Sequence, residues 1–480
     1  MLEQLATVAF LASTPVAAVS ANGGRLSPSD AMDDSERGGA RSGGAPVAAS
    51  SGRTPGRSLS RPGRVRTVAL WHPVCLRHAP SSSCPEQATR LRAVVAVLEE
   101  LQTAHPARLA VLTTPREVAT KYVCPTVHSH AYVSELTRAL PRPWEPPVCL
   151  GSARACANSA GAGSGLVWAD GERRSTREHR GVHATAATPA ATAAAHAAGD
   201  ACRGAGDAPA HDLDTFLSAE SMSAARHAAG AVCEAVDLVM RGACRNAFVA
   251  ARPPGHHAGP SGLALGAPSQ GFCLLNHVAI GARYALLTQP ELARVAIFDF
   301  DVHHGNGTQQ IVANDPSLLF LSLHVHDDET PFFPATGGEP SRPAAASEGP
   351  PRAALTQAGT AAGSGGGGGD NIVNLPLARN AGRQAFRDAC SHLLRRMQEW
   401  RPQLIVLSAG FDAHADDPLG GVEAGGPALL EEDFGWLTTR IVEVADAVCA
   451  GRIVSVLEGG YSPPCLRRCV GAHVTALLGP

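Results

Sequence analysis

The sequence predicts an α/β protein in which helices flank a central, mostly parallel β-sheet. Helix-like and strand-like segments alternate regularly over residues 219–457, as in chains built from successive β-α-β units. The strand-like segments are short, continuous apolar runs, which indicates strands that helices cover on both faces. Polar clusters rich in His and Asp follow four of these runs, which is typical of a parallel sheet with a functional site at one edge.

The first predicted strand covers residues 67–71, a short apolar run that ends before a His-Pro pair. Leucines and valines at helical spacing then predict a helix over residues 86–102. Residues 109–112 form a second apolar run and predict a strand, whereas residues 127–140 have the spacing of another helix.

The C-terminal half of the chain predicts the rest of the sheet. Apolar runs predict strands at residues 247–250, 295–298, 318–323, 404–408 and 453–457. Helical spacing predicts the helices at residues 219–241, 275–287, 382–400 and 431–449. Because a helix precedes most of these strands, crossover connections and parallel pairing are expected.

Three segments have the composition of disordered chain. Residues 20–66 are rich in Ser, Gly, Ala and Arg, and residues 1–66 are expected to be a disordered tail or, alternatively, an organelle transit peptide. Low-complexity insertions are expected at about residues 141–210 and 337–370, where too few large apolar side chains are present to offset the entropy of ordering. Residues 67–480 are therefore expected to form a single domain that carries these insertions.

Charge and cysteine content narrow the class of protein. The net charge is -3, with Lys+Arg 40 and Asp+Glu 43, so the chain lacks the basic surplus of an electrostatic nucleic-acid binder. The 13 cysteines show no paired framework, which favours a reducing compartment inside the cell. The early apolar stretch at residues 5–19 is too short to span a bilayer, so no membrane association is expected. The nucleus or cytoplasm is expected, with chloroplast or mitochondrion as the alternative if residues 1–66 act as a transit peptide.

Polar clusters bounded by glycines follow four of the predicted strands. In chain order they read Arg252-Pro-Pro-Gly-His-His257, Asp299-Phe-Asp-Val-His-His-Gly-Asn306-Gly, Gly410-Phe-Asp-Ala-His414 and Glu458-Gly-Gly-Tyr461. The carboxyl ends of parallel strands lie at one edge of a sheet, so these clusters are expected to converge there. Because four signals coincide, one functional site is a better interpretation than four unrelated turns.

The second and third clusters contain candidate metal ligands. Asp301 and His303 are two positions apart, so their side chains point the same way if the strand stays extended. Asp412 arrives from another strand as a third ligand. Two carboxylates and an imidazole suit zinc, and three protein ligands leave a position open, as in catalytic zinc sites. Asp299 is expected to stand behind these ligands and to orient an imidazole, and the same carboxylate-rich strand end suits a monovalent cation.

The other two clusters contain candidate acid, base and hydrogen-bond donor groups. His256 and His257 follow a stiff Pro-Pro-Gly turn and are suited to work as general base and acid beside a metal ion. Tyr461 follows two glycines and supplies a hydroxyl donor, which suits stabilisation of an oxyanion.

Five stretches resemble the histone deacetylase and acetylpolyamine amidohydrolase superfamily, which has the arginase-like fold. They are Arg252-Pro-Pro-Gly-His-His-Ala258, Gly271-Phe-Cys273 with Asn276, Asp299-Phe-Asp-Val-His-His-Gly-Asn-Gly-Thr308, Ser408-Ala-Gly-Phe-Asp-Ala-His414 and Leu457-Glu-Gly-Gly-Tyr461. Asn306 and the Leu-Glu-Gly-Gly-Tyr form look like class II histone deacetylases. The segment Asp370-Asn-Ile-Val-Asn-Leu-Pro-Leu377 is similar to plant and bacterial members, including organelle-type plant enzymes.

The resemblance implies a role for each matching residue. Zn²⁺ would be held by Asp301, His303 and Asp412. His257 would act as general base and acid, assisted by the remaining catalytic residues His256, Tyr461, Asp299 and Asn306. The acyl-lysine channel would be bounded by Gly271, Phe272 and Phe333, with Asp214 at its rim. A structural K⁺ would bind at Asp299, Asp301, His303, Ser322 and Leu323.

The implied activity is zinc-dependent hydrolysis of acetyl-lysine side chains in histones or other proteins, and hence a role in chromatin regulation. An acetylated protein is the expected partner, with corepressor-type or homo-oligomeric partners besides. Two alternatives stay open: hydrolysis of acetylated polyamines or other small acetylated amines, and a weakly active scaffold that binds acyl-lysine. Two-manganese chemistry of the arginase type is disfavoured, because Gly305 and His414 stand where that chemistry needs carboxylates.

Overall fold

The computed structural model describes residues 65–113, 116–152, 214–338 and 371–480. Residues 65–480 fall within one compact unit, Gly63–Pro480. The predicted tail lies outside the described residues except for its last two positions. Most of the two predicted insertions lies outside them as well. The described start of the first insertion includes β3 (Val148–Cys149), which pairs antiparallel with β4 (Phe216–Leu217).

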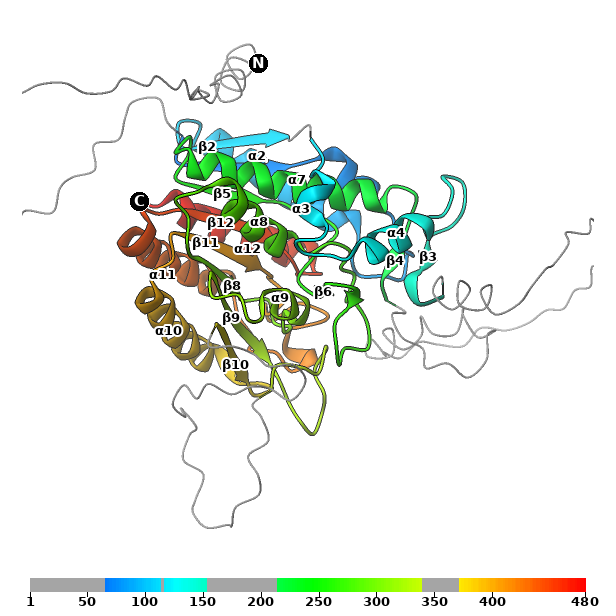
Figure 1. Cartoon of the computed structure of the whole chain (residues 1–480). Helices are drawn as coiled ribbons and strands as arrows, with labels where there is room; N and C mark the ends of the chain where they lie inside the picture. Colours follow the sequence, from blue (N-terminus) through cyan, green and yellow to red (C-terminus); the bar gives the residue numbers. More distant parts are fainter. Residues whose placement is uncertain (1–64, 114–115, 153–213, 339–370) are drawn as a thin grey trace, which may run out of the picture. The chain divides into compact units, whose positions relative to one another are not determined.

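A parallel β-sheet of eight strands forms the centre of the molecule, which confirms the predicted fold class (Figure 1). The strand order is β10-β9-β8-β11-β12-β5-β1-β2, and every pairing in this sheet is parallel. In chain order the strands are β1 (Thr67–Trp71), β2 (Leu109–Thr113), β5 (Asn246–Val249), β8 (Val295–Asp299), β9 (Leu318–Val325), β10 (Ile372–Leu377), β11 (Leu404–Ala409) and β12 (Ile453–Leu457).

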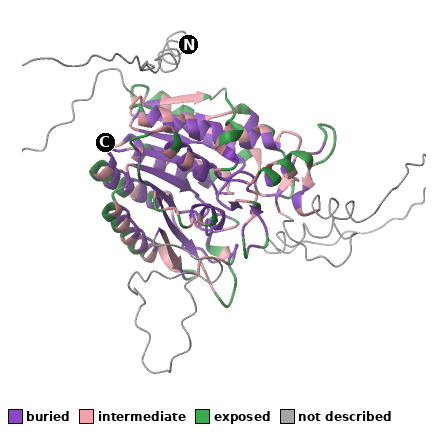
Figure 2. Cartoon of the chain, viewed as in Figure 1, coloured by how far each residue is buried: buried purple, intermediate pink, exposed green. Residues whose placement is uncertain are grey.

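Helices cover both faces of this sheet. One face is covered by α7 (Ser221–Met240) and α8 (His277–Thr288), which pack against each other and on the central strands. The other face is covered by a row of four helices in contact, namely α2 (Ala88–Ala104), α12 (Pro463–Leu478), α11 (Glu431–Cys449) and α10 (Gly382–Trp400). Figure 2 shows the consequence: the inner strands are buried, the edge strands β2 and β10 are only partly buried, and exposed residues lie on the outer sides of the helices.

Several short elements complete the described chain. They are η1 (Pro73–Arg77), α3 (Thr120–Val123), α4 (His130–Arg138), β6 (Ala258–Gly259), β7 (Gly262–Leu263), α9 (Asn306–Val312) and η4 (Val422–Ala424). The helix predicted at residues 127–140 is shorter than expected, because the Ser129 hydroxyl caps α4 by accepting a hydrogen bond from the Tyr132 amide. Across the described ranges, none of the helices combines the length and the apolar character that crossing a bilayer requires.

Two elements of the fold, β10 and α12, were not predicted from the sequence. Strand β10 lies at the edge of the sheet and is only partly buried, so it lacks the continuous burial of the central strands. It contains Pro376, a residue that edge strands tolerate. Helix α12 begins with Pro463 and buries Leu466, Val470, Val474 and Leu477, so its helical spacing was present in the sequence.

Buried neutral histidines make the fold sensitive to acid. Burial lowers the pKa of His473 to about 3, and burial lowers the pKa values of His128 and His277 to about 4. His473 lies between the hydroxyls of Thr438 and Ser455, at 2.7 and 2.9 Å. The folded chain therefore binds fewer protons than the unfolded chain below about pH 6.5. Each group lowers the free energy of unfolding by roughly 1–2 kcal/mol as the pH falls from about 6.5 to about 5.

We expect His473→Gln to weaken this acid sensitivity, since the variant lacks the group that must be protonated. Urea unfolding at about pH 7 and about pH 5 measures the effect, and the pH-dependent loss of stability should shrink by roughly 1–2 kcal/mol. The exposed His130 provides the control, because His130→Gln should keep the full dependence of the parent protein. An unchanged pH dependence in His473→Gln would contradict the prediction.

Candidate active site

Four neighbouring strands of the sheet deliver the candidate site residues to one edge. The strands β8, β11, β12 and β5 are adjacent in the sheet, and each ends in one of the polar clusters of the sequence. Because all four strands run in the same direction, the loops that follow them meet at the carboxyl edge. The structure thus brings the four clusters together.

Asp301, His303 and Asp412 form a compact, buried group of potential metal ligands. One ligand atom from each residue lies within 4.8 Å of the others. His303 Nδ1 is 3.0 Å from Asp301 Oδ1 and 3.1 Å from Asp412 Oδ2. The strand does not stay extended as far as Asp301 and His303, because β8 ends at Asp299. The two carboxylates at positions 299 and 301 instead accept the amide hydrogens two residues further on, and this turn directs Asp301 and His303 to one point.

The chemistry of this group fits a divalent ion such as zinc. Ligands at about 2.1 Å from a tetrahedral zinc ion lie about 3.4 Å apart, close to the two observed separations. Burial raises the pKa of Asp412, and the charge of Asp301 raises it further, so the site needs a cation. Although burial opposes it, both carboxylates raise the pKa of His303 to about 10. Without a metal ion, the protonated His303 balances part of the negative charge of Asp301 and Asp412, which a bound metal ion would otherwise balance.

His256 is held by Asp299. The carboxylate Oδ2 of Asp299 lies 3.0 Å from His256 Nδ1, and both side chains are buried. Although burial opposes the charge, Asp299 and Asp301 raise the pKa of His256 to about 10. His256 is therefore a cation at neutral pH, and its ring lies 3.9 Å from that of His257.

His257 has the opposite electrostatic environment. Its Nδ1 lies 2.8 Å from Asn306 Oδ1, so Nδ1–H donates to the amide and Nε2 keeps its lone pair. Burial lowers the pKa of His257 well below its ordinary value, and the charges of His256 and His303 lower it further. A neutral imidazole beside a charged one is an arrangement that can accept a proton and release it again.

Glu458 is a buried residue to which the sequence analysis gave no role. Its Oε2 accepts hydrogen bonds from the amides of Gly255 and His256, at 2.7 and 3.2 Å. Burial raises the pKa of Glu458 to about 7, although the charge of His256 opposes this. Glu458 thus fixes the turn that carries the two histidines. Its place in the Leu-Glu-Gly-Gly-Tyr motif was the signal for it.

Arg90 and Asp417 hold the segment that carries Tyr461. The guanidinium of Arg90 lies 4.7 Å from the centre of the Tyr461 ring and donates to the carbonyls of Glu458 and Gly460. Asp417 accepts a hydrogen bond from the Tyr461 amide at 2.6 Å. Burial raises the pKa of Tyr461 well above its ordinary value, although the charge of Arg90 opposes this rise. Its hydroxyl is therefore a protonated donor at neutral pH.

Two aromatic rings border the candidate catalytic groups. Phe272 packs edge-on against Tyr461 with ring centres 5.5 Å apart, and Phe333 packs in the same way against His257 at 5.0 Å. Phe332, which the sequence analysis did not consider, stacks on His303 at 5.3 Å. The two rings assigned to an acyl-lysine channel therefore lie beside the proposed acid–base and oxyanion groups.

Gly271 allows the backbone to pass close to His257 and Phe333. Its φ is +50°, and a Cβ atom there would lie 2.6 Å from His257 Cδ2 and 2.9 Å from Phe333 Cε1. We expect Gly271→Ala to cost about 1–2 kcal/mol of stability through backbone strain. We also expect a fall in turnover of roughly 10²-fold, because the added methyl group displaces the base.

A substitution at a second glycine distinguishes the effect of backbone strain from the effect of the steric clash at Gly271. Gly382 has φ of +79°, and a Cβ atom there would meet no other atom within 4 Å, so Gly382→Ala should show strain alone. Thermal unfolding and kcat measured for both variants test this. Equal turnover in the two variants would contradict the role of close packing at Gly271.

The remaining predicted residues lie near the site. Asp214 accepts a hydrogen bond from Ser269 at 2.6 Å, and the neighbouring Thr215 accepts one from the Phe272 amide at 3.3 Å, so Asp214 is close to the channel wall. Ser322 is the register partner of Asp299 on the adjacent strand β9. Its hydroxyl lies 2.9 Å from His324 Nδ1, and Leu323 is buried beside it. Potassium binding at these residues stays a prediction.

Fold and site together define an α/β protein with a buried group of potential metal ligands and a histidine pair at the carboxyl edge of a parallel sheet. The histone deacetylase domain model matches residues 84–477. The chain therefore belongs to the histone deacetylase domain family.

Known proteins of this family resemble the chain over different lengths. Type-2 histone deacetylase 1 of Dictyostelium discoideum is 34% identical over 466 residues, which is 88% of this chain and 29% of that protein. Histone deacetylase 10, chloroplastic, of Oryza sativa is 38% identical over 48% of this chain and 44% of its own length. The crystal structure of the HDA15 HD domain matches 86% of this chain and 88% of that domain, with a TM-score of 0.60 and 25% identity. The chain thus spans less than a third of the Dictyostelium relative.

Proposed function

We propose that this protein is a zinc-dependent deacetylase that hydrolyses acetylated lysine side chains of histones or other proteins. The observation that carries the proposal is the buried group Asp301, His303 and Asp412, next to a neutral His257 paired with a charged His256. When bound there, zinc would polarise the amide carbonyl and lower the pKa of a water molecule. Family membership supports the same reaction class.

The residues around the ligand group are suited to the proton transfers of amide hydrolysis. His257 takes a proton from the attacking water through Nε2, because Asn306 already occupies its Nδ1. The charged His256 stays protonated through its contact with Asp299 and stabilises negative charge nearby. The Tyr461 hydroxyl donates a hydrogen bond to the developing oxyanion, and His257 then gives its proton to the leaving amine.

An assay with defined substrates tests this proposal. The zinc-loaded protein should release acetate from acetyl-lysine peptides, and its rate on acetylated polyamines should be lower. Faster hydrolysis of acetylated polyamines would assign the site to small amines instead. Binding of acetyl-lysine peptides without hydrolysis of either class would replace the proposal by an acyl-lysine-binding scaffold.

We further propose that the protein acts in the nucleus or cytoplasm, with a chloroplast or mitochondrion as the alternative. The rice relative is named chloroplastic, which gives the organelle alternative a concrete form. A fluorescent protein fused to the C-terminus leaves residues 1–66 free and reports the compartment. Organelle fluorescence that disappears on deletion of residues 1–66 would establish a transit peptide, and diffuse or nuclear fluorescence would exclude one.

A further inference from the structure

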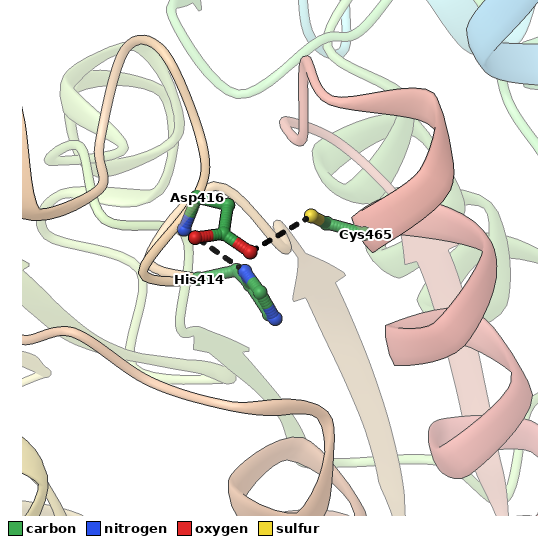
Figure 3. A group of neighbouring side chains, drawn as sticks. All are labelled: His414, Asp416 and Cys465. Carbon is green, nitrogen blue, oxygen red and sulfur yellow. Dashed lines mark hydrogen bonds between the residues drawn. The ribbon is translucent and has the colours of Figure 1, made fainter.

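A second cluster of potential metal ligands lies outside the candidate active site. Among the described residues, His414, Asp416 and Cys465 also place one ligand atom each within 4.8 Å of the others (Figure 3). His414 and Asp416 belong to the loop that follows β11, and Cys465 belongs to the first turn of α12. The cluster therefore links the loop of Asp412 to the segment that follows Tyr461.

From this cluster we infer a second zinc-class metal site, in which the ligands are an imidazole, a carboxylate and a thiolate. Nitrogen, oxygen and sulfur donors together select zinc and similar borderline ions over magnesium or calcium. The inference rests on these three residues alone and does not require the proposed deacetylase activity.

The hydrogen bonds of His414 support its role as a ligand. His414 Nε2 lies 3.4 Å from Glu431 Oε2, and its Nδ1 accepts the Asp416 amide hydrogen at 3.1 Å. The proton is therefore on Nε2, and Nδ1 presents a lone pair to the cluster. A carboxylate that accepts the second ring N–H is the usual partner of a metal-binding histidine. An ion at Nδ1 would replace the hydrogen bond that the Asp416 amide donates to this atom.

The positively charged side chain of Arg468 lies at the cluster and also pairs with Glu431 at 3.2 Å, so a metal ion would have to replace Arg468 there. Arg468 Nη2 lies 3.5 Å from Cys465 Sγ and 4.0 Å from Asp416 Oδ2, so the Arg468 guanidinium contacts both potential ligands. The Arg468 side chain is 44% exposed and can leave the cluster without breaking the core. Cys465 and His414 are buried, whereas the Asp416 side chain is 73% exposed, so the cluster is open to solvent on one side.

Cobalt substitution separates this site from the candidate active site. Co²⁺ bound by a thiolate has an intense near-ultraviolet charge-transfer band, and the Asp301, His303 and Asp412 group contains no sulfur. We expect a Co²⁺ titration of the metal-free protein to develop this band, with a final amplitude that corresponds to one Co²⁺–thiolate site per chain. The band should be absent in Cys465→Ala and present in Cys469→Ala, a control one helical turn along α12.

Two further variants make the result decisive. Asp416→Asn changes an exposed side chain, so the protein should fold, and its apparent Co²⁺ affinity at the thiolate site should fall at least about tenfold. Asp412→Asn should keep the band, because it removes only the charge of a ligand in the other group. A wild-type protein without the band, or a band that persists in Cys465→Ala, would overturn the inference, whatever the outcome of deacetylase assays.

Discussion

Asp412→Ala is expected to abolish metal binding at the candidate active site and to lower turnover by about 10³-fold or more. Asp412 supplies one of three ligand atoms and is fully buried. A site with two remaining ligands holds zinc weakly, and the loss of the ion removes several kcal/mol of transition-state stabilisation. Zinc content and kcat should be measured for Asp412→Ala in a protein that also carries Cys465→Ala. The second substitution removes a ligand of the proposed second metal site, so any remaining zinc reports the candidate active site.

The other atoms of Asp412 require a matched variant. Its Oδ1 accepts the Val302 amide hydrogen at 3.0 Å, so alanine also leaves a buried donor unpaired and costs about 1–3 kcal/mol of stability. Asp412→Asn keeps a hydrogen-bond acceptor of the same size and removes only the charge, so it should fold normally and still lose zinc. Glu423 is exposed, so Glu423→Ala is the control for loss of a carboxylate outside the site and should keep the zinc content of the parent protein. One equivalent of zinc in folded Asp412→Ala protein would remove Asp412 from the ligand set.

The sequence was sufficient to predict the parallel sheet and the location of its site. Strands β8, β11 and β12 are fully buried, and a strand that is buried on both faces is recognised in a sequence as a continuous apolar run. The His, Asp and Tyr residues of the candidate site directly follow these strands. Parallel pairing of the strands is therefore enough to predict that these residues meet at one edge of the sheet. Asp301 and His303 lie together as predicted, although a tight turn rather than an extended strand directs them to one point.

The contacts of the supporting residues could not be predicted, because they join segments that are distant in the sequence. Arg90 lies in α2, 370 positions before Gly460, whose carbonyl it binds. Asp417 and Glu458 are buried carboxylates whose partners are backbone amides, and a sequence does not reveal which amides are near. The cluster of His414 and Cys465 was missed for the same reason, since the two residues lie on different segments.

Tyr461→Phe is expected to lower kcat by roughly 10²–10³-fold while the protein folds and keeps its zinc. The ring contacts that hold Tyr461, with Arg90 at 4.7 Å and Phe272 at 5.5 Å, do not involve the hydroxyl, and Asp417 binds only the backbone amide. Phenylalanine should therefore occupy the same position. Because burial raises the pKa of Tyr461, the hydroxyl is a neutral donor in the working pH range, and its removal leaves the oxyanion without that hydrogen bond.

Turnover, zinc content and thermal stability measured on the same preparation distinguish this role from a structural one. Tyr122→Phe is the control, since Tyr122 lies in α3 and packs edge-on against Tyr284 at 4.7 Å, away from the four clusters. It should keep the turnover of the parent protein. If zinc-loaded Tyr461→Phe protein retained near-normal turnover, the oxyanion would have to be stabilised by other groups, and the charged His256 would be the first to test. A parallel loss of zinc would instead place Tyr461 among the residues that maintain the metal site.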